Sequence, residues 1–285
     1  MRKRDSLGPR VIPRELAIDA AATEEILVDF LRRETRRAGY TRAVIGLSGG
    51  IDSAVSAALA CRALGARRVL CALLPSRTSS AESLRDARRV ARSLGAPTET
   101  IGISPMVDAY FRRARGATLL RRGNRMARER MAILYDLSLR DRRLVIGTSN
   151  KTELLLGYGT LFGDMASALN PLGDLYKTQV RQLGSRLGIP EDIVWKTPTA
   201  DLWAGQSDER ELGYSYRAID RLLVRLVEQR DSPEEAAASG FPGRMIAMIG
   251  RRMARSQFKR RPPVIAKLTR RAVNIDFRYP RDWGS

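Results

Sequence analysis

A glycine-rich turn brings one acidic residue and two hydroxyls together within a few positions of the chain. Residues 43–53 have the sequence Ala-Val-Ile-Gly-Leu-Ser-Gly-Gly-Ile-Asp-Ser, and an apolar helical pattern follows over 54–64. Adjacent glycines permit positive φ angles and let a ligand approach the backbone closely. The free N–H groups and the dipole of the following helix favour an anion above the turn. The stretch therefore predicts a strand, a tight turn and a helix N-terminus that bind phosphate.

Asp52 is the unusual residue of this turn, because a carboxylate repels phosphate. A divalent cation between the two groups removes that repulsion, and Mg²⁺ prefers oxygen ligands. We therefore predict that Asp52 is a Mg²⁺ ligand. The alternative is a plain strand-to-helix turn with a cap. A Walker-type loop would need Gly-x4-Gly-Lys-Ser/Thr, and the sequence has no such pattern here.

A second polar stretch, residues 147–153, follows the apolar run 144–147 and contains Thr148 and Glu153. If this run forms a strand beside the first one, Glu153 and Asp52 overhang the same edge of the sheet. The two carboxylates could then hold one Mg²⁺ against the phosphates of ATP. The alternative for Glu153 is an ordinary acid in the first turn of a helix.

Three further cations carry specific expectations. Arg128 and Arg130 lie two positions apart in a helical pattern, so they point about 200° apart and need separate partners, one a ligand and one structural. The alternative is a solvated basic helix. Lys177 falls in the first turn of a predicted helix, where the dipole disfavours a cation, so we expect it to reach an anion.

The polar stretch 197–213 is interpreted as a lid that orders over nucleotide and excludes water.

The elements that must position these residues alternate between strands and helices. We predict strands at 42–47, 69–74, 98–103 and 144–147. We predict helices at 14–38, 54–64, 81–94, 104–115, 125–140, 176–187, 208–229 and 242–258, with 152–175 and 190–206 irregular. This alternation indicates an α/β fold with a doubly wound parallel sheet, Rossmann-like, flanked by helices. Ligands then bind beyond the carboxyl ends of the strands, where both polar loops fall.

Length and composition suit one globular domain. The chain has 285 residues, of which 44% are apolar, and no apolar run approaches the length of a membrane span. The basic N-terminus is not followed by the apolar segment of a signal peptide. Cys61 and Cys71 are interpreted as buried small apolar residues rather than a redox or metal pair. We expect a cytoplasmic protein with no membrane partner, with a flexible tail over 1–13, one domain over 14–275 and a C-terminal tail over 276–285.

The net charge of +20 is concentrated near the end of the chain, since residues 240–285 carry 12 Lys and Arg against 2 Asp. One interpretation is nucleic-acid binding. A second is an anionic substrate such as a dinucleotide with ATP. A third is the compositional bias of a chain that has 45 Arg and only 6 Lys. We favour bias together with an anionic substrate over nucleic acid.

The glycine turn resembles the pyrophosphatase loop of the N-type ATP pyrophosphatases, also called adenine nucleotide alpha hydrolase-like proteins. In that superfamily the loop grips the β,γ-pyrophosphate while a substrate oxygen attacks the α-phosphate. Further stretches run in order over roughly 42–265 and resemble the ammonia-dependent NAD synthetase family. They include Pro75-Ser76, Gly123-Asn124, Ala127-Arg128, Gly147 to Glu153, Gly163-Asp164, Asp174 to Val180, Leu187 to Pro190, Lys196 to Ala200, Asp208-Glu209, Glu211 to Gly213 and Lys259-Arg260.

This resemblance implies roles for particular residues. The implied ATP contacts are Gly46, Leu47, Ser48, Gly49, Gly50, Ile51, Asp52, Ser53, Thr148, Lys177 and Thr199. The implied Mg²⁺ ligands are Asp52 and Glu153, and the implied deamido-NAD contacts are Asn124, Arg128, Phe258 and Lys259. Asp164 is implied to position or deprotonate ammonia and joins Asp52 and Lys177 as the catalytic set. The family's homodimer builds the dinucleotide site across its interface, so we expect a homodimer.

The implied reaction is the ATP-dependent amidation of deamido-NAD to NAD with ammonia, through an NAD-adenylate, with release of AMP and pyrophosphate. The chain departs from many relatives at three positions, where Leu161, Ala168 and Phe258 stand in place of Lys, Asp and His. Only 41 residues precede the first predicted strand, too few for the amidase domain of glutamine-dependent relatives. We therefore expect free ammonia, or an amidase on another chain, to supply nitrogen. The alternatives are another pyrophosphatase-loop enzyme, such as a tRNA-modifying enzyme, and a non-catalytic nucleotide-binding regulator.

Overall fold

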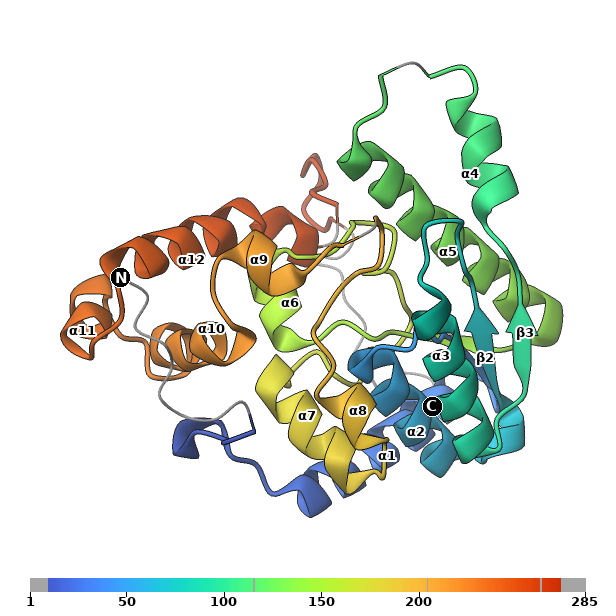
Figure 1. Cartoon of the computed structure of the whole chain (residues 1–285), viewed down its shortest axis with the longest axis horizontal. Coiled ribbons are helices and arrows are strands. Elements are labelled where there is room, and N and C mark those ends of the chain that lie inside the picture. The colour runs from blue at the N-terminus through green and yellow to red at the C-terminus, as the bar shows by residue number, and fades with distance from the viewer. Residues whose placement is uncertain (1–9, 115, 204, 262, 273–285) are drawn as a thin grey trace.

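A parallel four-stranded sheet forms the centre of the molecule in the computed structural model, which describes residues 10–114, 116–203, 205–261 and 263–272 (Figure 1). The strands are β1 (Ala43–Gly46), β2 (Val69–Leu73), β3 (Thr98–Thr100) and β4 (Leu144–Ile146). Their order is β3-β2-β1-β4, and every pairing is parallel. The predicted fold class is thus confirmed, and so is the condition that the fourth strand lies beside the first.

Helices cover both faces of this sheet and continue beyond it. They are α1 (Ala20–Arg37), α2 (Ile51–Leu64), α3 (Ala81–Leu94), α4 (Ser104–Phe111), α5 (Leu119–Asp141), α6 (Lys151–Leu156), α7 (Lys177–Arg186), α8 (Glu191–Val194), α9 (Asp208–Leu212), α10 (Tyr216–Leu223), α11 (Pro233–Ala238) and α12 (Gly243–Arg255). Short turns of other helix types lie at Arg14–Leu16, Ala66–Arg68, Val224–Glu228 and Gln257–Arg260. Of the described helices, none combines the length and the apolarity that crossing a membrane requires.

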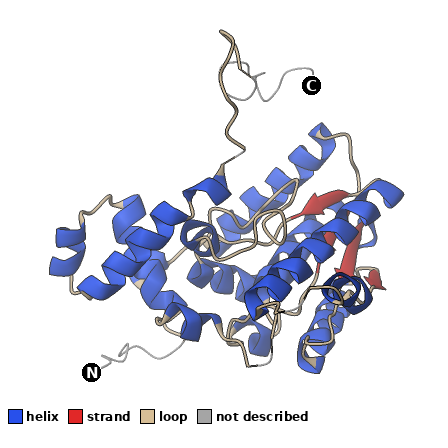
Figure 2. Ribbon diagram, turned by 90° about the horizontal axis from the view of Figure 1, so that it is seen from above, coloured by secondary structure: helices blue, strands red, loops and turns tan. Residues whose placement is uncertain are grey.

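Successive residues of β1 point to opposite faces of the sheet, and each face has its own core. Ala43 and Ile45 pack with residues of α1, α2, α3 and α7. Val44 packs on the other face with residues of α4 and α5. This alternation is the period of two that a strand imposes, and burial on both faces explains why the strands are apolar throughout. Figure 2 shows the sheet enclosed between helices in this way.

A third core lies outside the sheet and joins α10, α11 and α12, which gather on the left of Figure 1, to the end of α6. Its largest fully buried side chain is that of Tyr216, at the start of α10. Ile12 also packs against this core. Residues 1–9 of the predicted N-terminal tail over 1–13 lie outside the described residues. The whole of the predicted C-terminal tail over 276–285 also lies outside them.

Several element boundaries differ from the predicted ones, each for a local reason. The first helix begins at Ala20 rather than residue 14, because the Asp19 side chain accepts hydrogen bonds from the N–H groups of the first turn. The fifth helix begins at Leu119, six positions before the predicted start, because Thr118 caps it. The predicted helix over 208–229 is broken at Gly213, which has a φ of +78°. The prediction that residues 152–175 are loop-like was wrong at its start, where α6 forms.

Candidate active site

The turn between β1 and α2 requires glycine at one position in particular. Gly49 has a φ of +87°, and a Cβ built there would lie 2.2 Å from the backbone oxygen of Ser83 on α3. Gly50 has no such constraint, since its nearest neighbour would be the Ser48 hydroxyl at 3.5 Å. Helix α2 begins at Ile51, three positions before the predicted start, so Asp52 lies in its first turn. The free N–H groups at this N-terminus therefore face the carboxyl end of the sheet.

The two hydroxyls of the turn have different surroundings. Ser53 is buried, and its hydroxyl donates to the backbone oxygen of Gly50 at 2.9 Å. The Ser53 hydroxyl oxygen in turn accepts the N–H of Ser48 at 3.2 Å, so Ser53 closes the turn on itself. Ser48 is exposed, and its hydroxyl lies 3.1 Å from the Ser53 hydroxyl. Ser48 is thus the hydroxyl open to a ligand.

Helix α6 begins directly beyond β4, at the edge of the sheet next to the glycine turn. Asn150 caps it by accepting the N–H of Glu153 at 3.0 Å, and the Glu153 carboxylate accepts the N–H of Asn150 at 3.2 Å. This capping box gives Glu153 the helix-terminal role that was its predicted alternative. The Asn150 amide also donates to Asp52 Oδ1 at 2.9 Å, so it ties α6 to α2.

Lys177 joins the two carboxylates from a third helix. It is the first residue of α7, its side chain is 4% exposed, and its ammonium donates to Asp52 Oδ2 and lies 3.5 Å from Glu153 Oε1. Burial alone would lower the pKa of Lys177, but the Asp52 and Glu153 charges outweigh burial and raise it. The expectation that this lysine reaches an anion is confirmed, and in this structure the anion is a pair of carboxylates.

Asp220 of α10 holds the N-termini of α6 and α7 together. This fully buried carboxylate accepts the Thr152 hydroxyl at 2.6 Å, and the Thr178 hydroxyl and N–H at 2.7 and 2.8 Å. The Thr152 hydroxyl in turn accepts the Lys177 N–H at 3.0 Å. Burial raises the pKa of Asp220 to about 6, although the threonine hydrogen bonds oppose this.

Residues expected to contact the dinucleotide surround the loop between α6 and α7. Asn124 Oδ1 accepts the Thr160 hydroxyl at 2.8 Å, and Asp164 Oδ1 accepts the Thr160 N–H at 2.8 Å. Lys259 donates to the backbone oxygens of Gly157 and Gly159 at 2.8 and 2.7 Å. Lys259 and Asn124 therefore both hold the loop between α6 and α7, and Asp164 lies on that loop.

The two arginines of α5 have separate partners, as their spacing predicts. Arg130 donates to the backbone oxygen of Leu74, and burial lowers its pKa. Arg128 is exposed and donates to the backbone oxygen of Leu161 at 3.3 Å. Arg130 is thus the structural member of the pair, and Arg128 is the one that remains accessible to a ligand.

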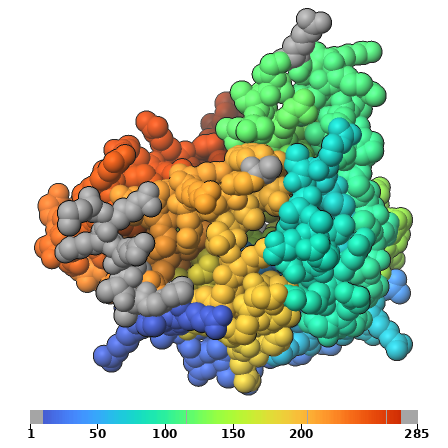
Figure 3. Space-filling view, in the orientation of Figure 1, coloured from blue at the N-terminus to red at the C-terminus, as the bar shows by residue number. Residues whose placement is uncertain are grey.

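The segment expected to act as a lid lies against α3 in this structure, as Figure 3 shows. Asp201 accepts the N–H of Ser80 at 2.9 Å, and Lys196 pairs with Asp86 at 2.7 Å. Thr199, an expected ATP contact, is exposed and accepts the Asp201 N–H at 3.1 Å. Thr199 therefore lies on the segment expected to act as a lid.

A model of the NAD synthase family matches residues 23–263 of the chain. The chain belongs to the NAD synthase family. It is 54% identical to the NH(3)-dependent NAD(+) synthetase of Trichlorobacter lovleyi, over 94% of this chain and 98% of that protein. Among solved structures it is similar to the NH3-dependent NAD synthetase of Campylobacter jejuni, with a TM-score of 0.75, 35% identity and coverage of 88% of this chain and 100% of that one. It is also similar to the NMN synthetase of Francisella tularensis, with a TM-score of 0.79, 33% identity and coverage of 88% and 99%.

The structure brings part of the predicted NAD synthase site together and leaves part apart. Asp52, Glu153 and Lys177 meet at one point. Thr148 follows β4 at the same edge of the sheet and is half-buried. Phe258 is 62% exposed, so it contacts little within this chain.

Two residues of this NAD synthase centre were not expected from the sequence. Asn150 could have been found, because Asn followed three positions later by Glu is the pattern of a capping box. Asp220 could not, since an acid in the middle of a helical pattern is ordinarily solvated. Its burial becomes visible only once α10 is packed against α6 and α7.

Proposed function

We propose that this chain converts deamido-NAD and ammonia to NAD while ATP is cleaved to AMP and pyrophosphate. The observation that carries the proposal is the meeting of Asp52, Glu153 and Lys177 beside the glycine turn. It lies between β1 and β4, where the strand order reverses and open α/β sheets bind their ligands. One buried cation at an anion-binding turn suits the departure of a negatively charged pyrophosphate.

The first step activates the nicotinate carboxylate. One of its oxygens attacks the α-phosphorus of ATP, and the bond from that phosphorus to the oxygen bridging to the β-phosphate breaks. The N–H groups from Gly49 to Ile51 bind the β- and γ-phosphates, with Ser48 as a hydroxyl donor. Lys177 exchanges one of its carboxylate contacts for a phosphate oxygen and neutralises the leaving group. Thr148 and Thr199 hold the ATP from the β4 edge and from the lid.

The second step transfers nitrogen. Ammonia attacks the carbonyl carbon of the adenylate, AMP leaves with the bonding electron pair, and the nitrogen loses a proton. Asp164 is the proposed acceptor of that proton. Arg128 and Lys259 bind the dinucleotide, with Asn124 and Phe258 beside them. Catalysis rests on positioning and on exclusion of water, because the adenylate would otherwise hydrolyse.

Asp52 and Glu153 are also proposed to hold Mg²⁺. The donor set fits this ion, since both carboxylates already reach one shared cation, the Lys177 ammonium. No group of three or more His, Cys, Asp or Glu suited to a metal occurs among the described residues. A site of two carboxylates completed by phosphate oxygens is what Mg²⁺ commonly uses in nucleotide enzymes. When bound, the ion would neutralise phosphate charge; the chain's own part is to hold the two carboxylates in place.

A second candidate substrate is the nicotinate mononucleotide, favoured by the similarity to the NMN synthetase of Francisella tularensis. The reacting carboxylate is the same in both molecules. The dinucleotide is preferred because the 54% identical relative is an NAD synthetase. The ratio of kcat/KM for the two substrates decides between them.

One assay tests the proposed function. ATP–pyrophosphate exchange should depend on deamido-NAD and should not need RNA. Exchange that ignores deamido-NAD but requires tRNA would assign the chain to the tRNA-modifying enzymes. Nucleotide binding without any exchange would favour the regulatory alternative. Asp52→Asn should abolish exchange while its circular dichroism spectrum stays unchanged.

We further propose a homodimer whose interface completes the dinucleotide site, and a cytoplasmic location, since the reaction consumes ATP. The exposed Phe258 and Arg128 support the first point, because an expected ligand contact that faces solvent leaves room for a second chain. Sedimentation equilibrium with and without deamido-NAD tests the dimer.

A further inference from the structure

The last described part of the chain carries a concentration of charge that the proposed reaction leaves almost unused. Between Glu235 and Asp276 the sequence contains no acidic residue, while its cations are Arg244, Arg251, Arg252, Arg255, Lys259, Arg260, Arg261, Lys267, Arg270 and Arg271. A general preference for arginine accounts for many cations. It does not account for the absence of every acid over this length.

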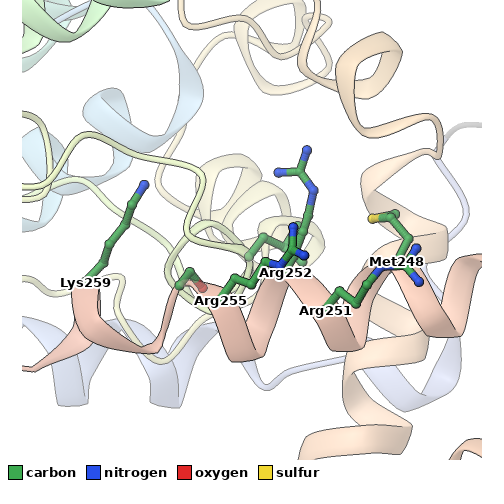
Figure 4. A pocket seen from close by; sticks show the side chains of 7 residues that line it. Met248, Arg251, Arg252, Arg255 and Lys259 are labelled. Carbon is green, nitrogen blue, oxygen red and sulfur yellow. The ribbon is translucent and has the colours of Figure 1, made fainter.

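A cavity of about 310 Å³ lies along α12, at the centre of this basic stretch. Four cations line it, namely Arg251, Arg252, Arg255 and Lys259, together with Leu156 and Met248. Figure 4 shows these cations following one another along α12 and the turn after it. Arg251 and Arg255 are four positions apart, which places them on one face of α12, and Lys259 follows on the short turn Gln257–Arg260. No carboxylate belongs to the lining.

The three arginines of this cavity lack the carboxylate partners that several other arginines have. Arg62, Arg140 and Arg221 each pair with a carboxylate. Arg260, one turn further on, donates to the backbone oxygens of Leu154 and Leu155 at 3.0 Å. Within the described residues, Arg251, Arg252 and Arg255 have neither an ion pair nor a hydrogen bond from their side chains. Their mutual repulsion is therefore left uncompensated.

The four cations face one cavity, where the charge of one changes the titration of another. Burial lowers the pKa of Lys259, the nearby Arg252 charge lowers it further, and Asp164 opposes both. Guanidinium groups suit phosphate, because each presents a planar set of donors that can bind two oxygens at once. A cavity of about 310 Å³ accommodates a compact anion with more than one phosphate.

We propose that the α12 cavity is a binding site for a diphosphate group, with Arg251 and Arg255 as its main ligands and Arg252 and Lys259 beside them. The diphosphate can belong to a dinucleotide or be a free anion. In both cases the site is separate from the glycine turn that binds ATP phosphates. Binding is measured without turnover, so the outcome does not depend on the proposed reaction.

The test uses full-length protein with EDTA and a saturating non-hydrolysable ATP analogue, so that the glycine turn is filled. Inorganic pyrophosphate is then titrated in a calorimeter. Wild type should bind one equivalent, and Arg251→Gln/Arg255→Gln should bind it about tenfold more weakly or worse. Both positions are exposed, so this variant should fold. Arg88→Gln/Arg92→Gln is the matched control, because these exposed arginines have the same spacing on α3 and should leave binding unchanged.

Steady-state kinetics then identify the source of the diphosphate. If it belongs to the dinucleotide, the KM for deamido-NAD rises in Arg251→Gln/Arg255→Gln and pyrophosphate competes with deamido-NAD. If it is a free anion, that KM stays constant and pyrophosphate binds together with deamido-NAD. Wild type that binds no pyrophosphate, or a variant that binds like wild type, would overturn the site. So would a tRNA that binds wild type much more tightly than pyrophosphate and is lost in the variant, since it would assign the cations to nucleic acid.

Discussion

Asp220 Oδ2 accepts hydrogen bonds from both the N–H and the hydroxyl of Thr178, at 2.8 and 2.7 Å. Thr178 follows Lys177 in the chain, and the second oxygen of Asp220 accepts the hydroxyl of Thr152, which precedes Glu153. One buried carboxylate on α10 thus fixes the neighbours of two residues that meet Asp52. Asp220 is therefore a positioning residue for the centre.

Replacing Asp220 by Asn should weaken both stability and activity. An amide in this place offers an N–H where Thr178 also donates, so at least one buried hydrogen bond is lost, at a cost of about 1.5–3 kcal/mol. We expect kcat to fall more than KM changes, because Lys177 and Glu153 lose their alignment. Urea unfolding and steady-state kinetics check both effects. Thr178→Ser keeps the hydroxyl and should resemble wild type; an Asp220→Asn enzyme that is less stable yet has normal kcat would limit Asp220 to a structural role.

Replacing Lys177 by Met should remove adenylation. The buried ammonium is the cation between Asp52 and Glu153, and losing such a group commonly lowers kcat by about 10²–10³-fold. Lys177→Arg should not restore activity, because a guanidinium does not fit a side-chain site that is 4% exposed. ATP–pyrophosphate exchange measures the loss. Lys151→Met is the control, since Lys151 pairs with Asp174 and Glu228 away from Asp52.

The two glycines of the turn should respond differently to alanine. Gly49→Ala places a methyl group against the Ser83 backbone oxygen at a positive φ, so we expect about 1–3 kcal/mol of destabilisation. Gly50→Ala meets only an ordinary contact with the Ser48 hydroxyl at 3.5 Å and has an ordinary φ of −88°, so it should change the free energy of unfolding little. Thermal unfolding of the ligand-free variants provides the comparison. Equal losses in both would mean that the turn relaxes around Gly49.

Stability should depend on pH through Glu153. Burial and the Asp52 charge raise the pKa of Glu153 to about 8, against the partial opposition of Lys177. Because the folded chain then holds this proton more tightly than the unfolded chain, the contribution to stability is complete below the ordinary value of 4.5 and is lost as the pH rises through about 8. Glu153→Gln, which keeps the capping box, should lack this loss. Urea unfolding of both proteins in EDTA across that range measures the difference, and parallel pH profiles would contradict it.

Mg²⁺ affinity should follow the same titration in the opposite sense. The ion needs an ionised carboxylate, so its affinity for wild type should rise as the pH approaches 8 and then level off. Glu153→Gln should bind Mg²⁺ more weakly and with less dependence on pH. Isothermal titration with MgCl₂ in the presence of a non-hydrolysable ATP analogue tests this point. An unchanged affinity in the variant would remove Glu153 from the metal site.

Local patterns determined a large part of this protein. The helix over 81–94 was predicted to the residue, because Ser80 caps it and Gly95 ends it at a φ of +66°. The parallel sheet follows from the alternation of apolar runs with helical patterns. The glycine turn predicted phosphate binding, because glycines that permit a positive φ, a helix N-terminus and an acid occur within a few neighbouring residues. The predicted helix boundaries differ from the observed ones where caps and packing decide them, as at Leu119 and in α6.

Ile26 shows the opposite case. Ile26 and Leu31 are both among the apolar residues that recur at helical spacing along α1, yet Ile26 is 66% exposed and Leu31 is fully buried. Period alone identifies a helix face, and only the neighbouring elements decide how much of that face they cover.

The sequence by itself determined the phosphate-binding turn, the sheet and the resemblance to NAD synthetases, since each depends on residues close together in the chain. Only the tertiary structure decided which charges meet. Lys177 lies 125 positions from Asp52, and Asp220 lies 68 positions from Thr152. Such contacts depend on how α6, α7 and α10 pack against one another, and burial then sets the strength of the resulting electrostatic interactions.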